Sequence, residues 1–372
     1  MNSKISIVKC KDYTPVLVQE ATGKAIDLIG GISNFIKPQS RVLVKPNLLM
    51  AKPPEFGIDT HPEVVRSVIK ILKEINCSIL VGDGPSVWGN QIKNVDEVYR
   101  RSGIEGVCEE ERVTLVKFDK RRWRKKFPLT TVLDECDYLV SLPKFKTHDF
   151  TILTAAIKNL FGLVSGTYKT ELHKKYSYPA SFADILVDIY EEARPVLNII
   201  DAIIAMEGDG PGTGGKLRNT GLLLAGADAV ALDSVLALIM GLAPCDILST
   251  KIASERGLGV ADINSIQILG EKLEEVIGGP FKLPSTSITH RLPRPVIELA
   301  KKLIRFYPKL NHKNCILCEA CIKACPSKVI SIKSNGIVID YSGCISCFCC
   351  QEACPSNAIK VKKSVLAKLV GL

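Results

Sequence analysis

Cysteine residues near the C-terminal end of the chain follow a spacing that suits iron–sulfur chemistry. The pattern Cys-x-x-Cys-x-x-Cys-x-x-x-Cys-Pro occurs twice, from Cys315 to Pro326 and from Cys344 to Pro355. Nine of the seventeen positions from Cys315 to Ser331 match the aligned positions from Cys344 to Lys360. A [4Fe–4S] cubane needs four converging thiolates, and a tight loop with cysteine at every third position supplies three of them. The duplication therefore predicts two such clusters.

The fourth thiolate of each predicted cluster comes from the other copy. In the two-cluster pattern, the cysteine before each proline ligates the cluster of the opposite copy. The first cluster is therefore assigned Cys315, Cys318, Cys321 and Cys354. The second cluster is assigned Cys344, Cys347, Cys350 and Cys325. The segment resembles the bacterial-type double [4Fe–4S] ferredoxin module over about residues 312 to 363, which implies low-potential transfer of single electrons.

Two other uses of these cysteines fit the spacing less well. A structural zinc site favours two Cys-x-x-Cys pairs, and a disulfide framework is typical of chains with a secretory signal, which this chain is expected to lack. Cys349, a ninth cysteine aligned with Ala320, is interpreted as a spare reduced thiol packed beside a cluster. The remaining cysteines indicate structural thiols in a reducing compartment: Cys10, Cys77, Cys108, Cys136 and Cys245.

A second set of reactive side chains follows four strand-like runs in the N-terminal part of the chain. These residues are Lys45, Asp83, Lys144, Lys146, His148 and Glu207. Ligands of an open α/β sheet bind beyond the carboxyl ends of its strands, so four such ends together predict a crevice. Any one of these charges alone would more simply face solvent.

The residue types of this second set suit a small anionic ligand. The three lysines are expected to neutralise a carboxylate or a phosphate, and His148 is expected to exchange a proton near neutral pH. Lys158 is expected to face the same crevice from a helix, one turn after Thr154. Asp83 and Glu207 are expected to bind a cation or to act as bases.

Other polar motifs receive simpler interpretations. A glycine-rich run from Gly208 to Gly215 contains a G-x-G-x-x-G match, but a strand rather than a helix follows it. It is therefore interpreted as a flexible lid or an anion-binding nest, not as a dinucleotide site. Thr60 to Glu63 predicts a helix start with a capping box, and His173 and His290 are expected at the surface.

The elements that must position these side chains alternate along the first 280 residues. Strand-like runs lie at residues 4–8, 41–44, 78–81, 114–118, 138–142, 196–200, 221–225 and 266–269. Helix-like runs lie at residues 15–35, 62–75, 151–161, 182–193 and 228–240. Short apolar strands separated by amphipathic helices predict an α/β fold, with a largely parallel sheet flanked by helices. A small α+β ferredoxin-like domain is expected to follow it.

The chain divides by composition into three parts. Residues 1–283 are expected to form the α/β domain, residues 284–311 a basic linker with one amphipathic helix, and residues 312–372 the double [4Fe–4S] ferredoxin domain. The linker helix is expected to pack the two domains together, with peripheral contact to an anionic membrane surface as the alternative.

Charge and hydropathy disfavour several classes of function. The 372 residues carry a formal net charge of +10, and two oxidised clusters would lower it to about +6. Basic residues gather at Lys120–Lys126, within an expected solvated hairpin at residues 113–127, but no nucleic-acid motif accompanies them. Nucleic-acid binding is therefore disfavoured. The absence of a long apolar run and of a targeting segment predicts a cytoplasmic protein without a transmembrane segment.

Several short motifs of the first part occur together. They are Val42–Leu48, Thr60–Pro62, Gly82–Pro85, Leu142–His148, Lys158–Gly162 and Met206–Pro211. As a set, over roughly residues 4 to 270, they resemble a bacterial and archaeal family described as domain of unknown function 362, whose members often carry this ferredoxin tail. The resemblance implies the architecture and a low-potential or anaerobic setting, without an established substrate.

Three hypotheses about function follow from these observations. The first is an oxidoreductase that couples two [4Fe–4S] clusters to a small anionic substrate or cofactor in the α/β domain and uses a redox partner protein. The second is a non-enzymatic electron carrier or maturation factor that docks a protein partner through its basic segments. The third is a proton-transfer enzyme in which the clusters are structural.

Overall fold

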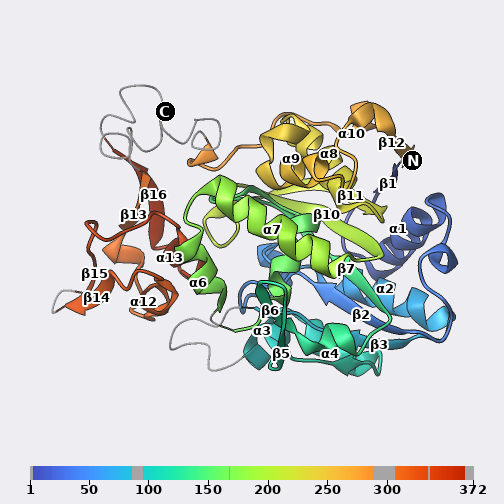
Figure 1. Ribbon diagram of the computed structural model, residues 1–372, viewed down its shortest axis with the longest axis horizontal. Helices are drawn as coiled ribbons and strands as arrows, with labels where there is room; N and C mark the ends of the chain where they lie inside the picture. The colour runs from blue at the N-terminus through green and yellow to red at the C-terminus, as the bar shows by residue number, and fades with distance from the viewer. Residues whose placement is uncertain (1–2, 86–94, 167, 288–305, 334–335, 365–372) are drawn as a thin grey trace.

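The structure, a computed structural model, describes residues 3–85, 95–166, 168–287, 306–333 and 336–364. A large α/β body holds the N-terminal part of the chain, and a smaller C-terminal body lies at one end of it (Figure 1). The linker helix predicted within residues 284–311 and His290 lie outside the described residues. Among the residues that are described, no helix is long and apolar enough to cross a membrane.

Within the described residues, the sheet of the large body has ten strands in the order β12-β1-β11-β10-β7-β2-β3-β4, with β8 attached to β10 and β9 to β8. Their bounds are β1 (Ser3–Lys9), β2 (Arg41–Pro46), β3 (Ser78–Val81), β4 (Thr114–Leu115), β7 (Tyr138–Leu142), β8 (Lys144–His148), β9 (Ile152–Thr154), β10 (Leu197–Gly208), β11 (Gly215–Gly226) and β12 (Ile266–Gly270). Pairing is antiparallel only at β1–β11, β10–β11 and β8–β9 among the pairs of this described sheet. The predicted α/β class with a largely parallel sheet is confirmed.

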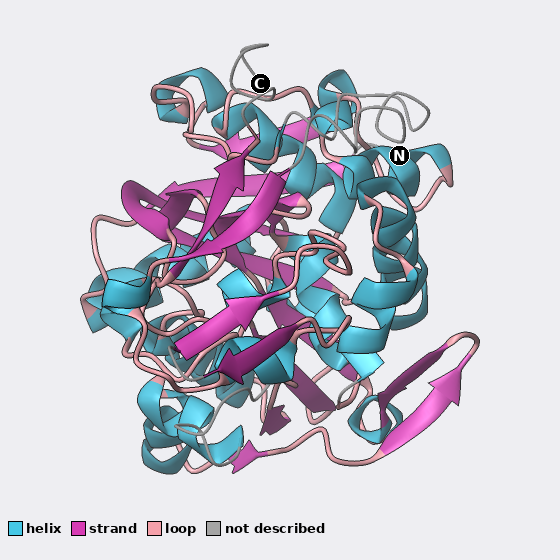
Figure 2. Cartoon of the chain, turned by 90° about the vertical axis from the view of Figure 1, so that its left-hand side faces the viewer, coloured by secondary structure: helices cyan, strands magenta, loops and turns pink. Residues whose placement is uncertain are grey.

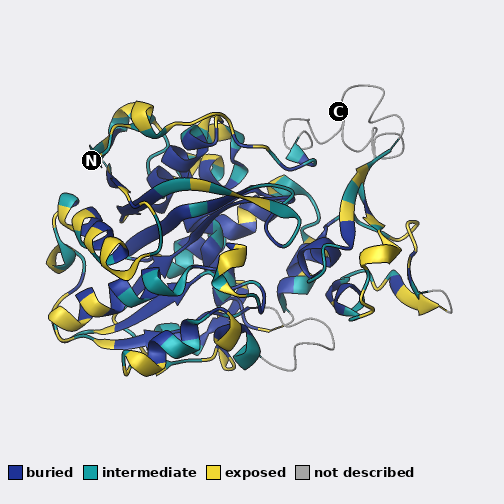
Figure 3. Cartoon of the chain, turned by 180° about the vertical axis from the view of Figure 1, so that it is seen from behind, coloured by how far each residue is buried: buried dark blue, intermediate teal, exposed yellow. Residues whose placement is uncertain are grey.

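Helices cover both faces of this sheet (Figure 2). One layer contains α1 (Pro15–Leu28), α2 (Pro62–Glu74), α3 (Val95–Arg101) and α4 (Ile104–Glu110). The other contains α5 (Ala156–Asn159), α6 (Tyr168–Lys175), α7 (Pro179–Ala193), α8 (Ala229–Ile239) and α9 (Leu248–Glu255), and α10 (Leu273–Val276) lies beside α8. Side chains alternate along a strand, so Val42 and Val44 of β2 pack in the first layer and Leu43 in the second. The buried strands run between exposed outer helix faces (Figure 3).

The residues from 143 to 161 fold differently from the prediction. The expected loop after β7 is strand β8, and the expected helix over residues 151–161 is split into β9 and the short helix α5. The carboxylate of Asp233 accepts hydrogen bonds from the backbone N–H groups of Ala156 and Ile157, at 2.7 and 3.1 Å, and so starts α5 there. Thr154 therefore lies on a strand, and its predicted helical relation to Lys158 is wrong.

Two local predictions also need correction. Helix α2 is capped by His61, whose Nδ1 accepts from the Glu63 N–H at 3.2 Å, because the Thr60 hydroxyl donates instead to the Leu142 carbonyl oxygen. The basic hairpin consists of β5 (Arg121–Arg124) and β6 (Phe127–Thr130) rather than residues 113–127. Its cations pair with carboxylates of the same chain: Arg124 with Asp134, Lys125 with Glu192 and Lys126 with Asp188.

The C-terminal body is built from two similar halves. Strand β13 (Phe306–Leu310) pairs with β16 (Ile359–Lys363), β14 (Ile330–Lys333) pairs with β15 (Gly336–Ile339), and the short helices are α12 (Ala320–Ala324) and α13 (Cys349–Glu352). Left-handed backbone recurs at aligned positions of the two copies: Leu317 and Ser346, Glu319 and Phe348, Lys328 and Asn357. The two copies of the cysteine motif therefore share their loop conformation as well as their spacing.

Candidate functional site

Two small cavities of the C-terminal body are each lined by four cysteines. The first cysteine cavity, of about 20 Å³, is lined by Cys315, Cys318, Cys321 and Cys354. The second cysteine cavity, also of about 20 Å³, is lined by Cys325, Cys344, Cys347 and Cys350. Each cavity thus gathers three cysteines of one copy and the cysteine before proline of the other.

The surroundings of these cysteines suit an iron–sulfur cluster. The other residues that line the second cysteine cavity are apolar apart from Ser327, and those of the first are apolar apart from Glu319 and Ser356. The backbone N–H of Ala358 donates to Cys354 Sγ at 3.2 Å. Four converging sulfurs, apolar walls and an N–H donor to sulfur are the features that hold such clusters and tune their potentials. The residues present therefore fit the group.

A third cavity, here named the central cavity, lies where the α/β body meets α13. Its volume is about 80 Å³. The ionisable residues that line it are Asp83, Lys146, His148, Lys158, Lys169, His173, Cys349 and Glu352. Charged groups from β8, α5 and α6 therefore meet two side chains of the C-terminal body around one partly open space.

The structure brings together only some of the predicted site residues. Asp83, Lys146, His148 and Lys158 line the central cavity, whereas Lys45, Lys144 and Glu207 do not. Glu207 pairs with Arg218 at 3.0 Å and accepts from the Lys282 N–H at 3.2 Å, in a partly exposed position. All four expected strand ends contribute to the crevice, the last of them through Pro211 instead of Glu207.

Lys45 and Asp83 form a buried ion pair behind the cavity wall. Lys45 Nζ lies 2.6 Å from Asp83 Oδ1, and both side chains are almost fully buried. The other carboxylate oxygen of Asp83 accepts from the Leu48 N–H at 2.8 Å. A Cβ on Gly162 would come within 2.6 Å of Lys45 Nζ and closer still to Asp83 Oδ1, so a side chain there would displace the ion pair. Lys45 therefore neutralises Asp83 instead of facing a ligand.

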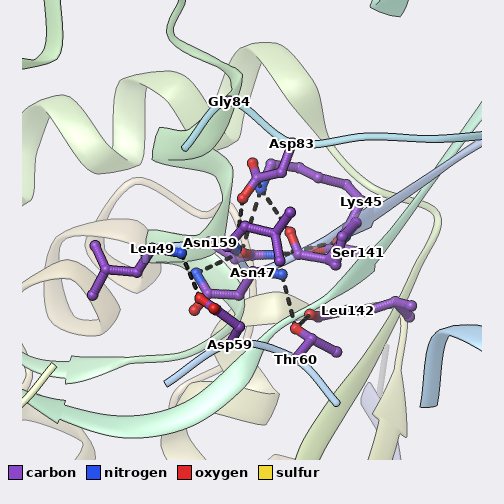
Figure 4. Close-up of polar contacts among 12 residues, drawn as sticks. Lys45, Asn47, Leu49, Asp59, Thr60, Asp83, Gly84, Ser141, Leu142 and Asn159 are labelled. Atoms are coloured by element: carbon purple, nitrogen blue, oxygen red, sulfur yellow. Dashed lines mark hydrogen bonds and ion pairs between the residues drawn. The ribbon is translucent and has the colours of Figure 1, made fainter. Parts of the chain in front are cut away.

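Polar contacts around this ion pair hold the neighbouring loops together (Figure 4). The Asn159 side-chain amide donates to Ser141 Oγ at 2.9 Å, and Lys45 Nζ lies 3.3 Å from Asn159 Oδ1. Asn47 donates from its side chain to Asn159 Oδ1 at 3.2 Å, and its backbone N–H donates to Thr60 Oγ1 at 2.8 Å. The network ties the carboxyl ends of β2 and β7 to α5, which carries Lys158.

Lys144 belongs to a separate buried group. Its ammonium lies 2.8 Å from Asp201 Oδ2 and 2.7 Å from the Tyr13 hydroxyl. The Tyr13 hydroxyl donates to Asp201 Oδ1 at 2.7 Å, and the Tyr13 ring stacks on His61 at 3.6 Å. Burial lowers the pKa of His61 to about 4, so this ring is neutral. These contacts join β8, β10 and the start of α2.

His148 links the α/β body to α13. Its Nδ1 accepts from the Phe150 N–H at 3.0 Å, which leaves the ring proton of the neutral form on Nε2. Nε2 lies 3.2 Å from Glu352 Oε1, so the imidazole ring and this carboxyl group are in contact. The predicted proton-exchanging histidine is therefore engaged with the C-terminal body in the wall of the central cavity.

Further contacts fix α13 against the glycine-rich loop between β10 and β11. The Gln351 side-chain amide donates to the Asp209 carbonyl oxygen at 2.9 Å, and the Thr213 hydroxyl donates to the Cys354 carbonyl oxygen at 2.8 Å. A Cβ on Gly212 would lie 3.1 Å from the Glu352 carbonyl oxygen. The loop predicted to be a lid or an anion nest instead forms the docking surface of the C-terminal body.

Several cavity residues were missed from the sequence. His173, expected at the surface, is buried among Phe150, Phe161 and Phe182, and this burial lowers its pKa to about 3. Lys169 lies on the polar helix α6, which gave no signal of burial. Cys349 and Glu352 could have been found from the sequence, because they differ from the residues at the aligned positions of the first copy, Ala320 and Lys323. Positions that differ between the copies mark the contacts with the α/β body.

Comparisons with known proteins agree with the two-part organisation. Residues 42–237 match the family described as "Domain of unknown function (DUF362)", and residues 307–355 match the "4Fe-4S dicluster domain". A thylakoid-associated protein of Synechocystis sp. is 31% identical over 323 residues, which cover 84% of this chain and 98% of the relative.

Two solved structures show weaker likenesses. The lactate racemase apoprotein from Thermoanaerobacterium thermosaccharolyticum is 13% identical, with a TM-score of 0.41 over 64% of this chain and 57% of its own. A protein from Thermotoga maritima is 11% identical, with a TM-score of 0.35 over 67% of this chain and 60% of its own.

Proposed function

Because the chain belongs to the domain of unknown function 362 family and contains a 4Fe–4S dicluster domain, we propose that it is an iron–sulfur oxidoreductase. Two [4Fe–4S] clusters would exchange single electrons with a small anionic substrate or cofactor in the central cavity. The observation that carries this proposal is the position of α13. Its Cys350 lines the second cysteine cavity, while the adjacent Cys349 lines the central cavity.

The ligand sets of the proposal are those that line the two cysteine cavities. Cys315, Cys318, Cys321 and Cys354 would hold the first cluster. Cys325, Cys344, Cys347 and Cys350 would hold the second. When bound, each cluster supplies a centre that accepts and releases one electron at low potential.

The residues around the central cavity would bind and orient the anionic partner. Lys146, Lys158 and Lys169 place ammonium groups in its wall, while Lys45 neutralises Asp83. His148 holds Glu352 at the junction with α13. Because these charges are largely buried, the low local dielectric would strengthen their interaction with a bound anion.

The proposal is tested by removing one cluster at a time. Protein purified without oxygen should contain about eight irons, and Cys318→Ala or Cys347→Ala should each lower the content and remove one paramagnetic signal after reduction. Cys77→Ala, at a scattered half-buried cysteine, is the matched control and should change neither. A colourless protein that contains zinc would refute the proposal. So would a Cys347→Ala protein that still transfers electrons to its ligand at the unaltered rate.

A second candidate function is an electron carrier for a protein partner. Ile316 and Leu317, beside the first cysteine cavity, are 50% and 55% exposed. The C-terminal body also carries exposed lysines: Lys309, Lys313, Lys328, Lys333, Lys360 and Lys362. An apolar patch among cations suits an acidic redox partner. Electron transfer from an acidic carrier should slow steeply with added salt, whereas salt-independent transfer would count against this function.

The site of action is proposed from the sequence and from the relative. The predicted location is cytoplasmic, and the relative described as thylakoid-associated supports a peripheral contact with a membrane. The protein should then sediment with vesicles that contain anionic lipid and remain in solution with neutral vesicles. Equal recovery with both kinds of vesicle would contradict a charge-driven membrane contact.

A further inference from the structure

Polar atoms from two separate elements, β9 and α6, lack partners in the central cavity. Thr154 is 1% exposed and His173 is 7% exposed, and both line this cavity. Within the described part of the chain, neither Thr154 Oγ1 nor His173 Nδ1 has a hydrogen-bond partner. Buried polar atoms of native proteins are nearly always satisfied, so both atoms point to something that occupies the space.

Lys158 adds an unmatched charge to these two atoms. Its ammonium lies 5.9 Å from the centre of the Phe161 ring and, among the described residues, makes no hydrogen bond or ion pair. The side chain keeps part of its surface accessible and lines the central cavity. Burial lowers the pKa of Lys158, while the proximity of Glu352 and Cys349 opposes this effect. An ammonium in such a place gains most from an anion within reach.

The other charges of the wall leave a positive surplus. Lys146 donates to the Ile58 carbonyl oxygen at 2.5 Å, and Lys169 donates to the Gly84 carbonyl oxygen, so each is bonded to a neutral acceptor. The carboxylate of Asp83 is matched by Lys45, and that of Glu352 faces His148. The buried Asp59, which lies outside the wall, contributes a partial counter-charge to Lys146.

The volume restricts what the cavity can hold. A water molecule needs about 10–15 Å³ on this measure, so a cavity of about 80 Å³ has room for roughly five to eight water-sized groups. That space suits a ligand of a few heavy atoms. A nucleotide or a dinucleotide does not fit in it.

We propose that the central cavity binds a small oxyanion, a carboxylate or a phosphate, whose charge pairs with Lys158 and whose oxygens bond Thr154 and His173. The inference rests on the proposed function for the ligand's redox role only, since binding itself needs no electron transfer. Cys349 would then lie beside the ligand, one residue from Cys350 of the second cysteine cavity.

Anaerobically purified, iron-loaded protein in an oxyanion-free buffer provides the test. It is titrated with inorganic phosphate and with oxalate by calorimetry, and the tighter binder identifies which oxyanion the cavity favours. ATP serves as the probe of size. Phosphate or oxalate should bind, and ATP should neither bind in the cavity nor displace them.

Two variants locate the binding site. Lys158→Met removes the charge, retains the length of the side chain and should weaken binding roughly 10- to 100-fold, as expected for loss of a charge-assisted hydrogen bond. Thr154→Val, which keeps the shape, should weaken it about fivefold and covers the case in which the first variant does not fold. Lys70→Met, at an exposed lysine of α2, is the matched control and should bind as the unaltered protein does.

Three results would overturn the inference: no binding of phosphate or oxalate at millimolar concentration, unaltered binding by Lys158→Met and Thr154→Val, or binding of ATP as tight as that of phosphate. The first two would leave ordered water as the occupant of the cavity. Failure of this inference about oxyanion binding is distinct from failure of the proposed function. Cys347→Ala should retain anion binding, so a protein that binds the anion without any electron transfer would refute only the redox role.

Discussion

The two cysteine copies share a spacing and a backbone but differ in their surroundings. Helix α13 presents Cys349, Gln351 and Glu352 to the α/β body, whereas the aligned residues of α12 are alanine, isoleucine and an exposed lysine. The loop tips differ in the same sense. Leu317 of the first copy is 55% exposed, whereas the aligned Ser346 donates to the Phe306 carbonyl oxygen at 2.8 Å. One copy therefore faces inward, toward the central cavity, and the other faces outward.

This difference shows how one motif can serve two roles. The cysteines and the left-handed loop positions are common to both copies, because both must present four sulfurs to an enclosed space. The remaining positions are free to adapt to their neighbours. Under the function proposed above, electrons would pass between the outward copy and the cavity through the inward copy, where Cys349 reaches the cavity wall.

Removal of iron should produce the largest difference between the two bodies. The C-terminal body has a small core in which cysteines take part, so a chelator in the presence of a reductant should unfold it. Hydrogen exchange should then lose all protection in residues 306–333 and 336–364, while the amides of β2, β3 and β7 stay protected. Retained protection in the C-terminal body would mean that it folds without metal.

The second largest effect is expected from breaking the buried ion pair of the α/β body. Lys45→Met leaves the carboxylate of Asp83 buried without its cation and should lower the free energy of unfolding by about 3–5 kcal/mol in a urea titration. The exposed pair of Lys251 with Glu255, at 3.9 Å, is the matched control, and Lys251→Met should cost less than about 0.5 kcal/mol. Similar losses for both variants would contradict the buried pair's role.

An exchange of residues between the copies tests their different surroundings. Gln351→Ile with Glu352→Lys places the residues of α12 on α13, removes the bond to Asp209 and sets a third cation beside Lys146 and Lys158. The docking of the two bodies should weaken by about 2–5 kcal/mol, read from limited proteolysis at the glycine-rich loop.

The reciprocal exchange provides the control for this experiment. Its charge change alone, Lys323→Glu at an exposed residue of α12, leaves the apolar packing of Ile322 intact and should alter neither proteolysis nor stability by more than about 0.5 kcal/mol. Equal sensitivity of the two helices would remove the distinction between an inward and an outward copy.

Binding of oxalate, which unlike phosphate keeps its charge over this range, should weaken as pH rises, by about tenfold or less between pH 6.5 and 8.5. Burial lowers the pKa of Lys169 to about 8 and that of Lys146 to about 7, so both lose charge in this range. Lys169 faces Asp83, Lys45 and Lys158. Lys146 faces Asp59, Lys158, Lys144 and Glu352. Deprotonation of Asp59, whose pKa burial raises to about 7, acts in the same direction. Affinity that increases with pH, measured by calorimetry, would contradict this assignment of charges.

Local signals in the sequence predicted part of this arrangement. The strands at residues 78–81 and 138–142 were predicted with the bounds that the structure has, because they are short apolar runs. The eight-cysteine spacing is also local, and it led to the same groups of four that line the two cysteine cavities. Strand β8 was missed because it carries Lys144, Lys146 and His148, whose burial depends on partners far along the chain.

Long-range packing explains the other places where the structure differs from the prediction. Lys158 was predicted to line the cavity, as it does, but from a helix that was expected to begin at residue 151. The helix begins later because the carboxylate of Asp233 in α8 binds the first N–H groups of α5. Lys169 and His173 lie on α6, whose sequence is polar. Aromatic rings from other elements pack around His173, and Lys169 donates to the Gly84 carbonyl oxygen. Glu207 has the same local setting as the other strand-end residues but pairs with Arg218 outside the cavity.

The central claim is that the inward copy and the ligand cavity are electronically adjacent. Its most direct test is a reductive titration of the anaerobic protein, followed by electron paramagnetic resonance, with and without saturating phosphate or oxalate. Two cluster signals are predicted, and only the one that Cys347→Ala removes should shift its potential when the anion binds. If the signal that Cys318→Ala removes shifts instead, or if neither signal shifts while the anion is bound, the claim is contradicted.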